Sequence, residues 1–313
     1  MDQTISSQSS DSAYRHPGQR FSKQHGIPTR KSDLLNYPKF LRAAAGLTEQ
    51  PPIDLAAIYQ HFGMAEPIRA PLVDQQGILV DASTGLILIK EDDAIARQRF
   101  TEGHELMELL FDAIEQASEQ VKEQAEPFYY WDHDEKERLC DQGAAELLMP
   151  RSQFTVDLQA VEISLARARS LAKLSQTSLM ATLIQMMKSG SGSYALVLWH
   201  PALRKQEQIA PKSVSQKSQK KPAKQPQRKP KKKQRVWWRC CTQDWTGGFI
   251  PPNKSVPSDS LIAQAHRDQQ TQIGTELLPI RKSPIHCRIE LLPIQTNQKS
   301  YVLSLLHPLD EKI

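Results

Sequence analysis

The run "PKSVSQKSQKKPAKQPQRKPKKKQR", residues 211–235, constrains more than any other feature how this chain can fold. It holds eleven Lys and Arg residues and no acid, and it has no apolar face that a core could bury. It is therefore predicted to be an extended, solvated loop or linker. The formal net charge of the chain is +5, and subtracting these eleven charges leaves −6 for the remainder. The folded parts on either side of the run are expected to be mildly acidic.

Hydrophobic periodicity predicts helices and strands in the rest of the chain. Two β-rich runs, 78–81 and 86–89, flank "DASTG" and predict a hairpin with Gly85 at the turn. Asp54 and Gly63 are predicted to cap the two ends of a helix that precedes this hairpin. The helices predicted after the hairpin cover 95–124, Glu135 to Pro150, 157–173, 176–188 and, near the C-terminus, 258–267.

The order of these elements predicts an α+β protein built from several parts. Residues 1–31 are rich in Ser, Gln and Arg without apolar periodicity, so they are predicted to be a disordered tail. Strand 194–199 is expected to join the sheet of the C-terminal part, so that the basic run is a long excursion between neighbouring strands. The predicted parts after the tail are a mainly helical domain at 32–150, a pair of helices at 151–190, a basic insert at 202–235, and a small α+β module formed by 191–201 and 236–313.

Several classes of protein are disfavoured by the composition. No apolar run approaches the roughly 20 residues that a membrane-spanning helix needs, and the N-terminal stretch has no apolar core typical of a signal peptide. The four cysteines, at 140, 240, 241 and 287, form no Cys-x-x-Cys pair. This spacing fits neither a zinc knuckle nor a disulfide framework, so reduced thiols and a cytoplasmic location are expected.

The segment "RFTEGHELMELLF", residues 99–111, carries the strongest chemical pattern. His104 and Glu108 are four residues apart on a predicted helix, so both side chains can point at one metal ion. Glu105 lies about 100° further round the helix axis, where its carboxylate can accept a proton from a water molecule. A second predicted helix offers Glu137 as a third ligand, and Asp141, one turn later, can hold the ring of His104 in the ligating tautomer.

These pieces resemble a known family. "RQRFTEGHELMELL" followed by "ERLCDQGAAELLMP" is similar to the ImmA/IrrE family of zinc metallo-endopeptidases. Its members typically read Arg-Phe-Thr-x-x-His-Glu-x-x-His, followed by an acidic helix that ends Phe-Ala-Ala-Glu-Leu-Leu-Met-Pro. The resemblance implies a zincin-like, mainly helical metallopeptidase domain at 32–150, with His104 as a zinc ligand, Glu105 as the general base and Glu137 as the acidic ligand. It also implies that the pair of helices at 151–190 is helix-turn-helix-like.

The chain departs from the family pattern at two positions. Glu108 stands where the second His is usual, and Gly143 stands where Phe is usual. One His and two Glu ligands leave a Zn²⁺ centre with no net charge, so the centre polarises water less than a site with two His ligands. The extra carboxylate also favours harder ions such as Mn²⁺ or Fe²⁺ as alternatives to zinc. We therefore predict that Glu108→His raises zinc affinity and lowers the pH optimum.

Three other groups are weaker candidates. His133, Tyr129 and Tyr130 precede the second helix of the motif, and one of them could stabilise an oxyanion, although an aromatic loop packed over the core is the favoured explanation. The helix pair after Pro150 lacks the polar cluster that reading of bases requires, so a packing or peptide-docking role is favoured. The candidate nucleic-acid contacts at the end of the basic insert are Lys231, Lys232, Lys233 and Arg235, with Trp237 and Trp238 as candidate stacking groups or, alternatively, core residues.

Two functions remain open from the sequence. The family resemblance implies an intracellular metal-dependent endopeptidase that cleaves a regulatory protein, such as a transcriptional repressor, in a stress response. Alternatively, the fold persists as a weakened or inactive regulatory module, which the basic insert tethers to nucleic acid or to an acidic partner. The two hypotheses differ at Glu105, because Glu105→Gln should abolish function only in the first.

Overall fold

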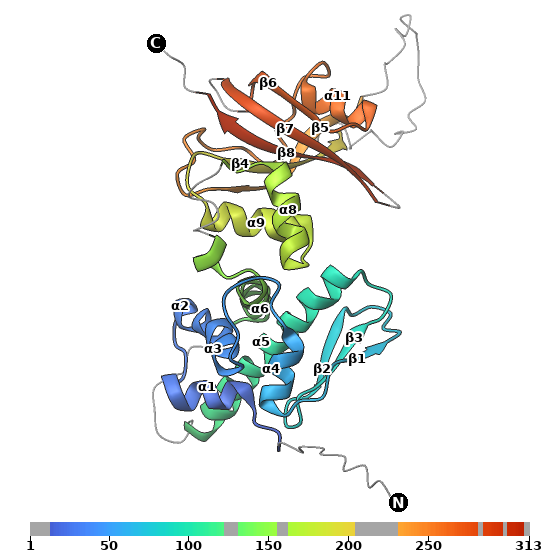
Figure 1. The fold of residues 1–313 in the computed structure, drawn as a ribbon. Helices are drawn as coiled ribbons and strands as arrows, with labels where there is room; N and C mark the ends of the chain where they lie inside the picture. The colour runs from blue at the N-terminus through green and yellow to red at the C-terminus, as the bar shows by residue number, and fades with distance from the viewer. Residues whose placement is uncertain are drawn as a thin grey trace, which may run out of the picture. The chain divides into compact units, whose positions relative to one another are not determined.

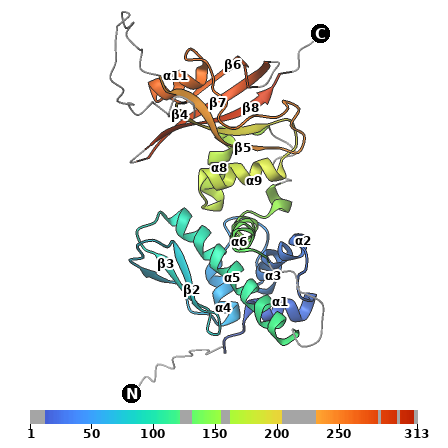
Figure 2. The ribbon, with the colours of Figure 1, turned by 180° about the vertical axis from the view of Figure 1, so that it is seen from behind.

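The computed structural model describes residues 13–121, 131–154, 162–203, 231–280, 284–296 and 299–309. The chain divides into two compact units, the first within Met1–Ala160 and Ala166–Gln185, and the second within Val161–Leu165 and Met186–Ile313. Figures 1 and 2 show that the first unit is mostly helical and that the second is built on one sheet. In the part of the chain that is described, no helix combines the length and apolar content that crossing a bilayer requires.

The first unit packs helices and a small sheet around one long helix, α5 (Figure 1). The predicted caps are present, since Asp54 accepts hydrogen bonds from the backbone N–H groups of Ala56 and Ala57, and Gly63 ends the helix in the left-handed conformation. The elements up to the end of α6 are α1 (Pro17–His25), α2 (Lys31–Leu34), α3 (Asn36–Ala44), α4 (Leu55–Phe62), β1 (Ile68–Ala70), β2 (Gly77–Asp81), β3 (Leu86–Lys90), α5 (Ile95–Val121) and α6 (His133–Leu148).

The predicted hairpin is present. Strands β2 and β3 pair antiparallel, and Gly85 between them has φ +69°, the left-handed conformation that favours glycine at a turn. Strand β1 is only three residues long, too short for a period-two pattern to predict it, and it pairs parallel with β3. The strand order β1-β3-β2 leaves β2 at the edge of the sheet, where it packs against α5.

Part of the predicted disordered tail is folded, so the prediction for residues 1–31 is wrong there. Residues 17–25 form helix α1, which packs against α5. Phe21 is its only strongly apolar residue and is almost fully buried. A Cβ atom on Gly18 would overlap the carbonyl oxygen of Leu109, so this glycine allows the two helices to approach closely. One phenylalanine and one glycine give too little periodicity to reveal a helix from sequence.

A helix pair follows Pro150, close to the prediction. It consists of α8 (Leu165–Ser175) and α9 (Leu179–Ser189), and residues 155–161 lie outside the described part. The hydroxyl oxygen of Ser178 accepts a hydrogen bond from the backbone N–H of Ala181 at 3.1 Å. Ser178 therefore caps α9, and Ser175 is the last residue of α8.

The second unit is a five-stranded antiparallel sheet in the order β5-β4-β8-β7-β6, with helix α11 packed on it. The expectation that strand 194–199 belongs to this sheet is confirmed, because β4 pairs with β5 and Ala202 lies opposite Lys233. The intervening residues 204–230 lie outside the described part. The elements are β4 (Ala195–Ala202), β5 (Lys233–Cys241), α11 (Leu261–Asp268), β6 (Gln272–Leu278), β7 (Ile285–Gln295) and β8 (Ser300–Pro308).

The core of the second unit lies between α11 and one face of the sheet. Trp199 is fully buried in this core, and its indole N–H donates a hydrogen bond to the hydroxyl of Ser304 at 2.8 Å. Ile262 and Ala265 of α11 belong to the same cluster of buried residues. The polar end of the largest core side chain is thus satisfied within the sheet.

Candidate metal centre

The candidate site lies where α5 and α6 pack against each other. A Cβ atom on Gly103 would lie 3.2 Å from the Cβ of Ala144, which is tighter than ordinary van der Waals contact. A Cβ on Gly143 would overlap the side chain of Met107, so Met107 fills the space that a side chain at position 143 would take. Small residues on both helices therefore set the short separation that brings polar side chains of α6 to His104.

His104 is held by one ring nitrogen and presents the other to acidic groups. Its Nδ1 lies 3.0 Å from Oδ1 of Asp141, and its Nε2 lies 3.6 Å from Oε2 of Glu137 and 3.9 Å from Oε1 of Glu108. Burial alone would lower the pKa of His104, but the hydrogen bond with Asp141 and the nearby carboxylates raise it overall. A neutral ring with its proton on Nδ1 would direct the Nε2 lone pair toward the two glutamates.

Glu105 is buried beside the edge strand β2. Glu105 is 6 % exposed. A Cβ atom on Gly77 would lie only 2.6 Å from its Oε1, so the glycine at this position of β2 leaves room for the carboxyl group. Burial raises the pKa of Glu105 to about 7, although His104 acts to lower it and the backbone N–H of Leu79 also favours the charged form. A carboxyl group with a pKa near neutrality is suited to accept and return a proton.

The carboxylate of Glu108 contacts two side chains of α6, an ammonium group and a thiol. Its Oε2 lies 2.7 Å from Nζ of Lys136, and its Oε1 lies 3.3 Å from Sγ of Cys140. Lys136 also lies 3.6 Å from Oε1 of Glu115 and over the ring of Phe111. Burial, together with the Glu108 carboxylate, raises the pKa of Cys140, so that its thiol donates a hydrogen bond to Glu108.

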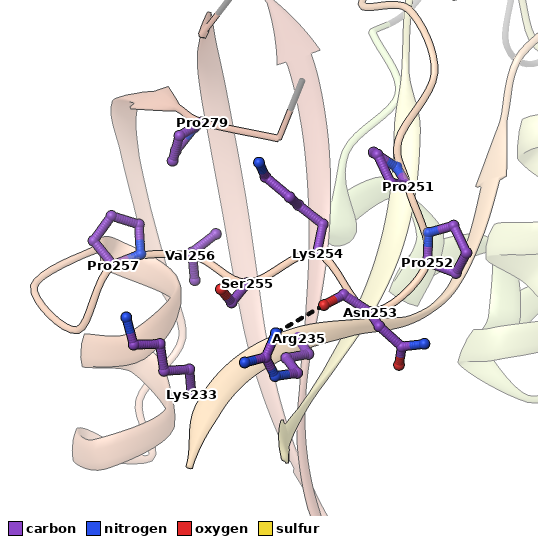
Figure 3. Close-up of a pocket in the computed structure, with 10 residues that line it drawn as sticks. All are labelled: Lys233, Arg235, Pro251, Pro252, Asn253, Lys254, Ser255, Val256, Pro257 and Pro279. Carbon is purple, nitrogen blue, oxygen red and sulfur yellow. Dashed lines mark hydrogen bonds between the residues drawn. The ribbon is translucent and has the colours of Figure 1, made fainter. Parts of the chain in front are cut away.

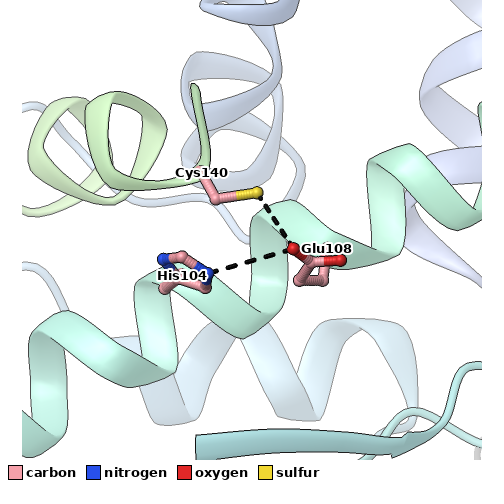
Figure 4. A group of neighbouring side chains, drawn as sticks. All are labelled: His104, Glu108 and Cys140. Carbon is pink, nitrogen blue, oxygen red and sulfur yellow. Dashed lines mark hydrogen bonds and ion pairs between the residues drawn. The ribbon is translucent and has the colours of Figure 1, made fainter. Parts of the chain in front are cut away.

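The three side chains His104, Glu108 and Cys140 form a compact cluster (Figure 4). One donor atom from each lies within 4.8 Å of the other two, and Figure 4 shows an oxygen of Glu108 between the imidazole and the sulfur. Glu137 approaches the same Nε2 of His104 from α6. Imidazole nitrogen and carboxylate oxygens are ligand types of zinc, so the donors that converge here fit a divalent cation.

The residues predicted from sequence are brought together to different degrees. On the two motif helices, Glu108, Glu137 and Asp141 each place a carboxylate oxygen within 4 Å of a ring nitrogen of His104. His133 is exposed at the start of α6 and, among the described residues, has no hydrogen bond or ion pair with this cluster. Tyr129 and Tyr130 lie outside the described residues. The basic residues Lys231, Lys232, Lys233 and Arg235 belong to the second unit.

Sequence reasoning missed two residues at the site, Lys136 and Cys140. The spacing contained this information, because Lys136 and Cys140, like Glu137 and Asp141, are four residues apart, which places the two pairs side by side on one face of a helix. Only the two acids, Glu137 and Asp141, are residue types that the metal-site pattern predicts. The lysine and the thiol instead contact the carboxylate that replaces the usual histidine.

Comparison with known proteins supports the resemblance seen in the sequence. Residues 64–182, which include the hairpin, α5 and α6, match the family model of the IrrE N-terminal-like domain. These residues are therefore similar to the IrrE N-terminal-like domain family. The family is a metallopeptidase family, so the match supports a metallopeptidase-like fold for this region.

The chain also has a structural neighbour over most of its length. A transcriptional regulator of Mycobacterium tuberculosis is similar with a TM-score of 0.54, covering 94% of this chain and 80% of the neighbour at 10% sequence identity. At this identity the likeness concerns the fold alone. A comparison with curated proteins gives no match.

Proposed function

We propose that this protein is a metal-dependent endopeptidase of the ImmA/IrrE type, which cleaves a regulatory protein such as a transcriptional repressor in a stress response. The observation that carries the proposal is the convergence of α5 and α6, which sets Nε2 of His104 3.6 Å from Glu137 and 3.9 Å from Glu108. Glu105 adds a buried carboxyl group with a pKa of about 7 on the helix of His104. The IrrE N-terminal-like family supports the peptidase class.

His104, Glu108 and Glu137 are the residues that would hold the ion. Ligand atoms around a tetrahedral zinc with bonds of about 2.0–2.1 Å are separated by roughly 3.3 Å. The observed separations of 3.6 Å and 3.9 Å are longer, so both carboxylates would have to move closer to His104 to share one ion. Zinc is the proposed ion, with Mn²⁺ or Fe²⁺ as alternatives because two of the three ligands are carboxylates. When bound, such an ion lowers the pKa of water and polarises a carbonyl group.

The chain's own residues would supply the remaining steps. Glu105 would take a proton from the attacking water molecule and deliver it to the leaving amine, since its pKa is close to neutrality. Asp141 would keep the proton of His104 on Nδ1 and fix the ring through their 3.0 Å contact. Lys136 would hold Glu108 in place and offset the negative charge that the exchange of His for Glu adds to the site.

The substrate proposal is supported more indirectly. Family resemblance points to a repressor, and a neighbour with a similar fold is described as a transcriptional regulator. A chain of two compact units is suited to such a role, because one unit can carry the peptidase-like site while the other receives a signal.

A second candidate function is a non-catalytic regulatory module with the same fold. The observation that favours it is the 2.7 Å contact between Lys136 and Glu108, because an ammonium group can satisfy this carboxylate without a metal ion. In this case, the basic residues of 211–235 would tether the module to nucleic acid or to an acidic partner.

One experiment separates the two candidates. A candidate repressor is incubated with the unmodified protein and zinc, with the unmodified protein and a chelator, and with the Glu105→Gln variant and zinc. The cleavage products are identified by mass spectrometry. The peptidase proposal predicts cleavage that both the chelator and Glu105→Gln abolish, while zinc binding by the variant is retained. Regulation of the repressor that persists in Glu105→Gln and in the presence of chelator would favour the non-catalytic module.

A further inference from the structure

The second unit contains a basic pocket that lies apart from the metal-site residues in sequence and belongs to a different unit. It has a volume of about 450 Å³, within the range of pockets for small ligands. It is formed by the start of β5, the loop 251–257 and the residue after β6 (Figure 3). Its lining residues are Lys233, Arg235, Pro251, Pro252, Asn253, Lys254, Ser255, Val256, Pro257 and Pro279.

The walls of this pocket are held in place by backbone hydrogen bonds. The N–H of Val236 donates to the carbonyl of Lys254, and the N–H of Asn253 donates to the carbonyl of Val236, both at 2.9 Å. The N–H of Val256 donates to the carbonyl of Gln234 at 3.1 Å. The loop therefore pairs with the outer edge of β5, and its three prolines further restrict its backbone. A site with fixed walls needs little ordering when a ligand binds.

The charge of the pocket has one sign. Lys233, Arg235 and Lys254 line it, and none of the ten lining residues is acidic. The side chain of Arg235 is 6 % exposed, and its Nε and Nη1 donate to the carbonyl oxygens of Ala202 at 3.1 Å and Asn253 at 3.0 Å. Within the described part of the chain, no carboxylate lies within ion-pair distance of this guanidinium. A buried cation without a counter-charge is costly, and an anionic ligand would lower that cost.

We propose that this pocket binds a phosphate group, supplied either by a free nucleotide or by a nucleic-acid backbone. A guanidinium and two ammonium groups around one cavity match the charge and the hydrogen-bond acceptors of a phosphate. Ser255 adds a hydroxyl group to the lining. Lys231 and Lys232 are exposed directly before β5, so a longer polyanion that enters the pocket would meet two further cations. The proposal is independent of peptidase activity, since its residues all belong to the second unit.

The test compares two double variants of the full chain that change the charge equally. Lys233→Gln with Lys254→Gln removes two cations from the pocket, whereas Arg239→Gln with Lys299→Gln removes two from outside it. Binding of inorganic pyrophosphate and of a short oligo(dT) is measured by calorimetry at near-physiological salt. Thermal unfolding checks that each variant is folded, which is expected because Lys233 is exposed and Lys254 is half-buried.

The proposal predicts that pyrophosphate affinity falls about tenfold or more in the pocket variant and less than about twofold in the control variant, because two charge-assisted hydrogen bonds are lost only in the first. A nucleic-acid backbone is identified as the source of the phosphate if oligo(dT) binds much more tightly than pyrophosphate and if the double variant Lys231→Gln with Lys232→Gln weakens oligo(dT) binding. Similar affinity for the two probes would identify a free phosphate compound. Equal losses in the two double variants, or no binding of either probe by the unmodified protein, would overturn the proposal.

Discussion

Glu105 offers the sharpest prediction, because its burial has a cost that can be measured without any metal. Burial raises the pKa of this carboxyl group from 4.5 to about 7 in the folded protein. The folded state therefore binds the proton more tightly than the unfolded state does. The resulting stability is fully present below about pH 4.5 and is lost as the pH rises through about 7.

The magnitude follows from the two pKa values. An ionised Glu105 at about pH 8 lowers the free energy of unfolding by about 3 kcal/mol relative to a neutral group of the same shape, and at about pH 5 the loss is about 1 kcal/mol. Gln has that shape and no charge. Glu105→Gln is therefore expected to stabilise the metal-free first unit by about 3 kcal/mol at the higher pH and by about 1 kcal/mol at the lower.

The assay is urea-dependent hydrogen exchange of peptides from α5, in the presence of a chelator, which reports on the first unit alone. Glu91→Gln is the matched control, because Glu91 is exposed just after β3. The control is expected to change the free energy of unfolding by less than about 0.5 kcal/mol at both pH values. A Glu105→Gln variant that is no more stable than the original protein at the higher pH would refute the reasoning, and so would an equal gain at both.

Three further predictions concern the site and its support. Glu108→His should raise zinc affinity, measured by competition with a chelating dye, and lower the pH optimum of cleavage, and equal zinc affinity in the two proteins would exclude this. Asp141→Ala should lower zinc affinity by about 10–100-fold, because it releases Nδ1 of His104. It should have little effect on stability, since the Asp141 side chain is 61% exposed. Unchanged zinc affinity would show that Asp141 does not orient His104. Gly18→Val should lower the free energy of unfolding by about 2 kcal/mol in urea titrations, because the new side chain meets the backbone of α5, whereas wild-type stability would indicate that α1 does not dock there.

Much of the fold follows from local patterns in the sequence. The hairpin around Gly85 and the helices α5 and α6 were predicted because strong periodicity and turn residues agree there. The placement of β4 beside β5, despite the basic insert, was also predicted, since each strand needs a partner to bury its apolar face. Helix α1 was missed because its docking depends on the close approach that Gly18 allows, which only the folded structure reveals.

The candidate site was predictable in part for a similar reason. The spacing of His104, Glu108, Glu137 and Asp141 places them on two helix faces, but spacing does not show how closely the two helices approach. That distance depends on Gly103 packing against Ala144. The neighbours of Glu108 were not predicted, because Lys136 and Cys140 reach it from the other helix of the pair. Contacts across a helix pair depend on tertiary packing and are only weakly encoded in local sequence.

The central claim is that α5 and α6 hold one metal ion between His104, Glu108 and Glu137. Crystals of the protein grown with zinc, with diffraction recorded at the zinc absorption edge, test it most directly. The account predicts one anomalous peak in the first unit, about 2 Å from Nε2 of His104 and from a carboxylate oxygen of Glu137. The absence of a peak there, with Lys136 still paired to Glu108, would contradict it.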